Sequence, residues 1–236
     1  SDNVNHLDGS FYYPRHGFGT IFEKMKDYIG EDNIRFDSPI KKVIHKDQKI
    51  LEVYYGNSRI NNVDMIINTL PVNTLINSLD PSPPESIKNI VNTIKYRDLK
   101  LCVIYLDTPS FTNNASIYFP ESIYPFTRIY EPKNRSKDMA PNDKTCIVIE
   151  IPYNQDSELF SKSNKELFEN ISDILINNKL IKRKQIIDHK LIEAKYAYPI
   201  LEIGLKYSLQ NIFYYLNNFE NIDIVGRNAQ FKYIHT

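Results

Sequence analysis

The sequence predicts an α+β protein of two domains. Short apolar runs typical of β-strands fill residues 34–68 and again residues 99–152, and blocks with a helical spacing of apolar residues lie between and after them. Prolines interrupt the chain at Asp80-Pro-Ser-Pro-Pro84, and Tyr198-Pro199 ends a later block. These two interruptions mark the places where we expect the chain to pass between domains.

The expected domain organisation is an insertion. Residues 1–80 and 204–236 should meet as one incomplete domain, and residues 81–203 should form an antiparallel sheet with covering helices. At 236 residues with 42% hydrophobic side chains, the chain has enough apolar material for packed cores.

The first part of the sequence predicts a loop, then a helix, then a meander of short strands. Pro and Gly punctuate the loop over 12–19, and apolar residues recur at helical spacing over 21–29 before Gly30. Four short strands are then expected, with a turn at Gly56-Asn57: residues 34–36, 40–44, 50–55 and 64–68.

The middle of the chain predicts helices around the prolines and then a sheet. The helices are expected over 72–79 and 87–94. Ser163-Asn-Lys-Glu166 has the spacing of a capping box, so a helix that covers the sheet should begin there. Residues 133–142 are expected to form a polar loop. The sheet strands are predicted at 99–107, 116–120, 127–131, 145–152 and 186–194.

The carboxy-terminal part predicts a helix over 209–216 and then a strand that ends in a glycine. Ile222 to Val225 is a short apolar run, Gly226 follows it, and Arg227 comes next. A glycine at this place lets another backbone or a ligand approach without a Cβ in the way, and the arginine adds a fixed positive charge. The alternative is a strand that simply ends in a glycine turn.

Composition limits the partners. Twenty-nine Lys plus Arg balance 29 Asp plus Glu, so the positive charge typical of a nucleic-acid or anionic-membrane binder is missing. No apolar run approaches the roughly 18 residues that span a bilayer. We expect a small-molecule substrate, no nucleic-acid partner and no membrane span.

The cysteines and histidines predict neither disulfides nor a metal site. Cys102 and Cys146 each lie in an apolar strand-like run, which is typical of buried thiols and favours a reducing, cytoplasmic location. The five histidines show no pair at metal-ligand spacing on one helix, and there is no Cys-x-x-Cys pair.

The segment Gly226-Arg227-x-x-x-Phe231-x-Tyr233 resembles the carboxy-terminal flavin-contacting segment of the FAD-dependent amine oxidoreductase superfamily. The nearest relatives look like the protoporphyrinogen-oxidase-like proteins and the UDP-galactopyranose mutases. Ala229 stands where that pattern commonly has a second glycine. In the loop over 12–19, His16 stands where a similar superfamily element has its first glycine.

The resemblance implies that FAD is the cofactor. It also implies that residues 1–80 and 204–236 belong to the FAD-binding domain and that residues 81–203 form a substrate-binding domain inserted into it. The cofactor-binding residues that it implies are Val43, Pro71, Gly226, Arg227 and Tyr233. The resemblance names no catalytic residue.

Four further side chains are candidates to bind substrate. Arg15 and Arg128 could hold an anionic group of the substrate or the developing negative charge of the flavin, and Tyr118 and Tyr130 could enclose the substrate. The alternatives stay open, because arginines are commonly surface charges and tyrosine is a good strand former whose ring packs while its hydroxyl stays wet.

One element of a flavoprotein is missing from the sequence. No Gly-x-Gly-x-x-Gly follows a strand, and Gly17-Phe-Gly19 opens a helix without a preceding strand. We therefore expect the chain to be the carboxy-proximal part of a larger flavoprotein, which alone binds FAD poorly and is inactive.

The resemblance implies two activities for the parent. The first is an oxidoreductase of the amine oxidase or protoporphyrinogen-oxidase-like type, which transfers a hydride from substrate to flavin. The alternative is a flavin-dependent sugar mutase of the UDP-galactopyranose mutase type. A non-catalytic binding domain on the same scaffold is the third possibility.

Overall fold

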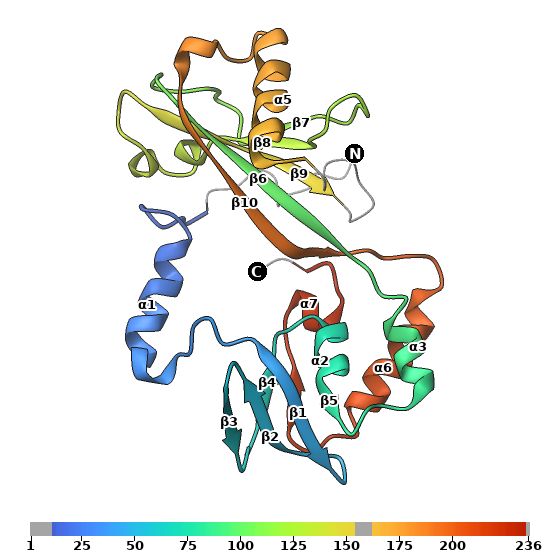
Figure 1. Cartoon of the computed structure of the whole chain (residues 1–236). Helices are drawn as coiled ribbons and strands as arrows, with labels where there is room; N and C mark the ends of the chain where they lie inside the picture. Colours follow the sequence, from blue (N-terminus) through green and yellow to red (C-terminus); the bar gives the residue numbers. More distant parts are fainter. Residues whose placement is uncertain (1–10, 154–161, 235–236) are drawn as a thin grey trace. The chain divides into compact units, whose positions relative to one another are not determined.

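The chain forms two compact units in the computed structural model, which describes residues 11–153 and 162–234 (Figure 1). Unit 1 takes its described residues from 1–34 and 99–194, and unit 2 from 35–98 and 195–236. Each unit has its own hydrophobic core.

Unit 1 contains a five-stranded sheet in the order β10-β6-β9-β8-β7. Where the register is defined, β7–β8 and β8–β9 are antiparallel. One face packs against helix α5 (Asn164–Asn177), whose Leu167, Ile171 and Leu175 are fully buried against alternate residues of the strands. The strands are β6 (Tyr96–Leu106), β7 (Ile117–Tyr118), β8 (Arg128–Tyr130), β9 (Thr145–Tyr153) and β10 (Ile186–Pro199).

The predicted capping box is confirmed at the start of α5. The Ser163 hydroxyl accepts from the backbone N–H of Glu166, and the Glu166 carboxylate accepts from the backbone N–H of Ser163. Unit 1 also contains α1 (Gly19–Ile29) and the 3₁₀ turns η1 (Glu31–Asn33), η2 (Pro132–Asn134), η3 (Lys137–Met139) and η4 (Arg183–Gln185).

Unit 2 contains two small sheets. The first has the order β3-β2-β1-β5, with β1, β2 and β3 antiparallel and β5 parallel to β1. The second is a parallel pair, β11 with β4. The strands are β1 (Ile40–Lys46), β2 (Lys49–Tyr55), β3 (Ser58–Asn61), β4 (Ile66–Asn68), β5 (Leu79–Asp80) and β11 (Ile222–Ile224).

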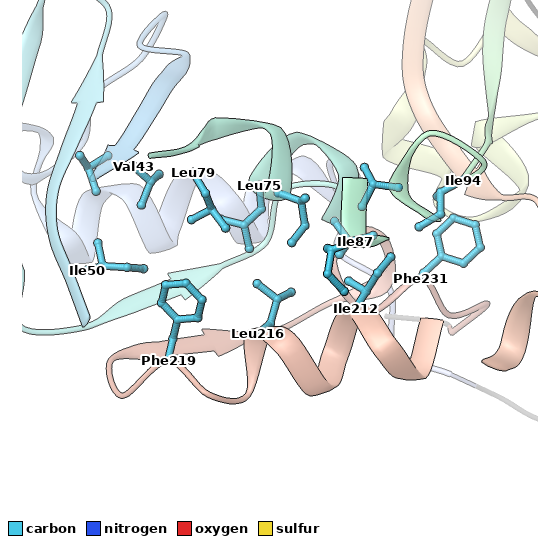
Figure 2. Packing of buried hydrophobic residues seen from close by; sticks show 14 residues of the cluster. Val43, Ile50, Leu75, Leu79, Ile87, Ile94, Ile212, Leu216, Phe219 and Phe231 are labelled. Carbon is cyan, nitrogen blue, oxygen red and sulfur yellow. The ribbon is translucent and has the colours of Figure 1, made fainter. Parts of the chain in front are cut away.

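The helices of unit 2 share one core with the first sheet (Figure 2). Leu75, Ile87, Ile212 and Leu216 point into this core together with Val43 of β1. The helices that contribute to this core are α2 (Val72–Ser78), α3 (Glu85–Val91) and α6 (Leu205–Leu216), and the short helix α7 (Arg227–Gln230) follows β11.

The compact units divide the chain at positions other than the expected domain boundaries. The prolines after Asp80 do not separate units, because Ile87 and Val91 of α3 are buried in the core of unit 2. Residues 11–34 group with the five-stranded sheet rather than with the meander. The assignment of one unit to FAD and the other to substrate stays a prediction.

Single elements also differ from prediction. The strand expected at residues 34–36 is wrong: the structure has no strand there, Phe36 is exposed, and Asp37 has a φ of 51° that ends an extended run. The strand β3, the turns η2 and η3 inside the expected polar loop, and the one-turn helix α7 were not predicted.

Candidate functional site

The first group of candidate residues lies where β4 and β11 end. The two strands are parallel neighbours, with Ile224 opposite Asn68, and the Val225 N–H donates to the Asn68 carbonyl at 3.0 Å. The segments that follow the strands therefore leave from the same edge and carry Pro71 and Gly226. The carboxyl edge of parallel strands is where ligands bind in open α/β sheets.

Gly226 has a backbone conformation that favours glycine. Its φ of 93° and ψ of 168° lie in a region that is essentially limited to glycine. A Cβ built on it would meet no other atom within 4 Å. The backbone at this turn therefore has free space beside it, which fits a cofactor that runs close past the main chain.

Tyr96 links the two segments that follow β4 and β11 through hydrogen bonds. Its hydroxyl donates to the Asn228 carbonyl at 2.8 Å and accepts from the Val72 N–H at 3.3 Å, so it joins the starts of α2 and α7. Burial raises the pKa of Tyr96. The Asn228 side-chain oxygen is buried and has no hydrogen-bond partner among the described residues, so a polar ligand atom or a water could satisfy it.

The guanidinium of Arg227 forms hydrogen bonds with backbone carbonyls of this chain. Its Nε and Nη2 donate to the Ile234 carbonyl at 2.9 and 2.7 Å, and Nη1 lies 3.5 Å from the Ala197 carbonyl. Its guanidinium carbon lies 5.3 and 5.4 Å from the ring centroids of Tyr198 and Tyr233, which stack on each other. Arg227 and Tyr233 thus fasten the carboxy-terminal segment, and their contact with a cofactor stays a proposal.

Val43 lies in the core rather than at that edge. Its side chain is 2% exposed, and β1 is flanked by β2 and β5, with Val43 opposite Val53 and Leu79. The side chain also lines a cavity of about 600 Å³ between the meander and β4. A backbone contact from Val43 to the cofactor is untested and stays a proposal.

The second group lies in unit 1, on the sheet face opposite α5. Arg128 of β8 is directly opposite Tyr118 of β7 on one side and Glu150 of β9 on the other. The Arg128 guanidinium carbon lies 6.0 Å from the ring centroid of Tyr118 and 5.3 Å from that of Tyr130. The structure therefore brings together three of the four predicted substrate-binding residues. We call Tyr118, Arg128, Tyr130 and Glu150 the arginine ladder.

Glu150 was not predicted, and it makes the strongest contact of the ladder. Both of its carboxylate oxygens accept from Arg128, one from Nε at 3.0 Å and the other from Nη2. Burial lowers the pKa of Arg128, but the hydrogen bonds to Glu150 and Tyr118 outweigh it and raise the pKa. Burial, followed by the nearby Glu150 charge, raises the pKa of Tyr130. Arg128 thus stays a cation and Tyr130 a neutral phenol.

Arg15 does not join the ladder among the described residues. Its Nε pairs with Asp138 of η3 at 2.7 Å, its carbonyl accepts from the Ser136 hydroxyl, and its side chain is 80% exposed. These contacts attach the loop before α1 to η3. A role for Arg15 in substrate binding stays a proposal.

Contacts of Glu131 and Lys133 join the end of β8 to neighbouring loops. Glu131, next to Tyr130, is 1% exposed and accepts from the N–H groups of Phe111 and Thr112 and from the Thr145 hydroxyl. The Lys133 ammonium lies within 3.1 Å of the carbonyls of Pro109, Pro141, Asn142 and Lys144. The loops on both sides of β8 are therefore tied to it.

Neither a metal site nor a membrane span appears in the part of the chain that the structure describes. Within residues 11–153 and 162–234, no three His, Cys, Asp or Glu side chains are grouped as metal ligands would be. No helix in these ranges has the length and apolar character needed to cross a bilayer.

The fold is that of the FAD-dependent amine oxidoreductase superfamily. A crystal structure of reduced UDP-galactopyranose mutase is similar with a TM-score of 0.78 and 17% identity, over 96% of this chain and 50% of that one. A putative protoporphyrinogen oxidase from Exiguobacterium sp. 255-15 gives a TM-score of 0.71 and 13% identity, over 90% and 46% of the two chains. A putrescine oxidase gives 0.56 and 15%, over 75% and 38%. The resemblance found in the sequence is confirmed.

The UDP-galactopyranose mutase family model matches residues 8–174. The chain therefore belongs to the UDP-galactopyranose mutase family. No curated protein sequence matches the chain. The chain spans about half the length of the similar solved structures that cover most of it.

Proposed function

We propose that the parent of this chain is a flavin-dependent mutase that isomerises a UDP-linked galactose between its pyranose and furanose rings. The observation that carries the proposal is the match of the mutase family model to residues 8–174. Of the two activities implied by the sequence, this is the alternative rather than the first choice.

The two groups of residues have separate tasks in this proposal. At the edge formed by β4 and β11, Pro71 and Gly226 lie beside the cofactor, and Arg227 and Tyr233 hold the segment that follows. The bound FAD supplies the redox-active flavin ring. In unit 1, Arg128 pairs with a phosphate of the substrate, and Tyr118 and Tyr130 flank it. Arg15 and Val43 remain candidates for substrate and cofactor respectively.

We further propose that the FAD domain is completed by sequence outside this chain. Parallel sheets are normally covered on both faces and contain more than two strands. The β4–β11 pair instead leaves Ile67 67% exposed and Val225, directly after β11, 47% exposed. The chain also spans about half of the similar mutase structure. Alone, it should bind FAD poorly and be inactive.

An oxidoreductase of the amine oxidase or protoporphyrinogen-oxidase-like type is the second candidate. Its support is the structural similarity to a putative protoporphyrinogen oxidase and to a putrescine oxidase. A non-catalytic binding domain is the third. For all three we propose a cytoplasmic protein, consistent with the free thiols of Cys102 and Cys146.

The activity of the purified full-length parent separates these candidates. Flavin absorbance is expected, and its absence would favour the non-catalytic domain. With the flavin reduced chemically, UDP-galactopyranose should be converted to an isomer of the same mass, resolved by chromatography, with no net consumption of oxygen. Oxygen or acceptor consumption that depends on an amine or porphyrinogen substrate, without isomerisation, would overturn the mutase proposal.

The proposed cofactor edge has its own test in the parent. Gly226→Val should abolish flavin retention while the protein stays folded, because a side chain would obstruct the approach of the cofactor. Gly204→Val is the control for a valine at another glycine with a positive φ, 86°, and open space around it; Gly204 lies at the start of α6 in the αL region, which a side chain strains less than the conformation of Gly226. Equal flavin loss in both variants would show that backbone strain, and not cofactor contact, is the cause.

A further inference from the structure

Glu150 makes the most extensive polar contact with Arg128. The two residues are directly opposite in the antiparallel pair β8–β9, and two parallel hydrogen bonds join them. The Glu150 side chain is 12% exposed and that of Arg128 is 30% exposed. We propose that Glu150 is a positioning residue, which fixes the Arg128 guanidinium so that its remaining end receives an anionic phosphate group of the substrate. This inference rests on the proposed function.

Glu150 restricts the way in which an oxyanion can reach Arg128. Glu150 occupies the Nε and Nη2 edge of the guanidinium, and the rings of Tyr118 and Tyr130 lie within 6.0 Å of its central carbon. A ligand oxygen must therefore use a guanidinium donor that Glu150 does not occupy, where it would share or replace the hydrogen bond between Arg128 and Tyr118. All four side chains are on strands, which hold a binding group more accurately than loops do.

Removing the Glu150 charge should change anion affinity in opposite directions under the two explanations of its role. The Arg128–Glu150 pair carries no net charge, so Glu150 also repels an approaching anion. If charge alone mattered, removing the Glu150 charge would tighten anion binding. If orientation matters more, the same removal frees the long Arg128 side chain to adopt other rotamers and binding weakens.

The experiment measures UDP binding to the purified full-length parent by calorimetry, with pyrophosphate as a second probe. Glu150→Gln should weaken UDP binding about tenfold, the size of effect expected when a well-placed charge-assisted hydrogen bond is lost. Glu150→Asp keeps the charge but shortens the side chain, so it should also weaken binding, and it serves if the Gln variant does not fold. Glu121→Gln, an exposed carboxylate in the same unit, should leave binding unchanged.

A double-variant cycle separates positioning from a merely structural role. Arg128→Lys removes the planar fork, so adding Glu150→Gln to it should change UDP binding by less than twofold. Additive losses would mean that Glu150 acts without Arg128 and would overturn the assignment, as would unchanged or tighter binding in both Glu150 variants. A wild-type parent that binds neither UDP nor pyrophosphate would instead overturn the phosphate role of Arg128 in the proposed function, and the positioning role with it.

Discussion

At the scale of single residues, the segment from Arg128 to Asn134 combines two tasks. Arg128 and Tyr130 belong to the arginine ladder, whereas Glu131 and Lys133 form hydrogen bonds with the loops beside β8. Alternation along β8 puts Arg128 and Tyr130 on one face, whereas Glu131 follows the end of the strand and Lys133 lies in the turn η2. A substitution in this short stretch can therefore alter either binding or stability, depending on which of these two pairs it changes.

Glu131 should be one of the most costly residues in unit 1 to replace. Glu131→Gln removes the charge that strengthens three hydrogen bonds, and its amide nitrogen can only donate, so the Thr145 hydroxyl must turn and accept instead. We expect unfolding in urea to require about 2–3 kcal/mol less free energy. Glu121→Gln, at an exposed position, is the control and should change it by less than about 0.5 kcal/mol. A loss for Glu131→Gln no larger than the control's would mean that these hydrogen bonds do not stabilise the native state.

The residues of the candidate site could be predicted unequally. Arg128, Tyr118 and Tyr130 could be proposed from the sequence, because an arginine can hold an anionic group and tyrosine rings can enclose a substrate. Glu150 was not found, because the pairing of β8 with β9 is a long-range register that sequence spacing does not contain. Glu131 and Lys133 were missed because their partners are mostly backbone groups of other loops.

At the scale of elements, α1 and α5 show what an amphipathic pattern does and does not predict. Both helices were predicted from the same periodicity, and both are present. On α5 the apolar face is buried, but on α1 no residue is buried, and Phe22 and Met25 are 60% and 54% exposed. The pattern therefore indicates a face that can be buried without naming the element that covers it.

Substitutions on the two helix faces should differ sharply in this chain. Met25→Gln together with Tyr28→Gln on α1 should change the free energy of unfolding by less than about 0.5 kcal/mol, because both side chains are already in water. Leu167→Ala on α5 should lower it by about 2–5 kcal/mol, because Leu167 is 0% exposed. Denaturant unfolding measures both, and a large loss from the α1 variant would mean that its face is covered in solution.

At the scale of the whole molecule, the fold class was predictable and the division into units was not. The class follows from the strand and helix patterns, which are local. The prolines at residues 81–84 indicated a boundary, yet the chain continues into α3 in the same unit. Prolines stop an element, but only long-range burial of residues such as Ile87 and Val91 decides with which core the next element packs.

Burial of Cys102 in the core of unit 1 makes the stability of the chain sensitive to alkali. Cys102 is 0% exposed, and burial raises the pKa of its thiol from 9.0 to about 12. Burial also raises the pKa of Cys146 and of the phenols Tyr130 and Tyr215. Above pH 9 the unfolded chain releases the Cys102 proton while the folded chain keeps it, so the folded state binds more protons and stability falls as pH rises. The contribution is fully present below pH 9 and is lost between pH 9 and pH 12.

One buried thiol can contribute a slope of at most about 1.4 kcal/mol per pH unit to this loss. Urea unfolding followed across that range should show a decline in the wild-type chain, and a shallower decline in Cys102→Ala. The alanine variant should be less stable at neutral pH because of the cavity that it leaves, so the comparison is between slopes and not between absolute values. Parallel slopes would mean that Cys102 ionises as readily in the folded chain as in the unfolded one, and that the core of unit 1 admits water at the centre of β6.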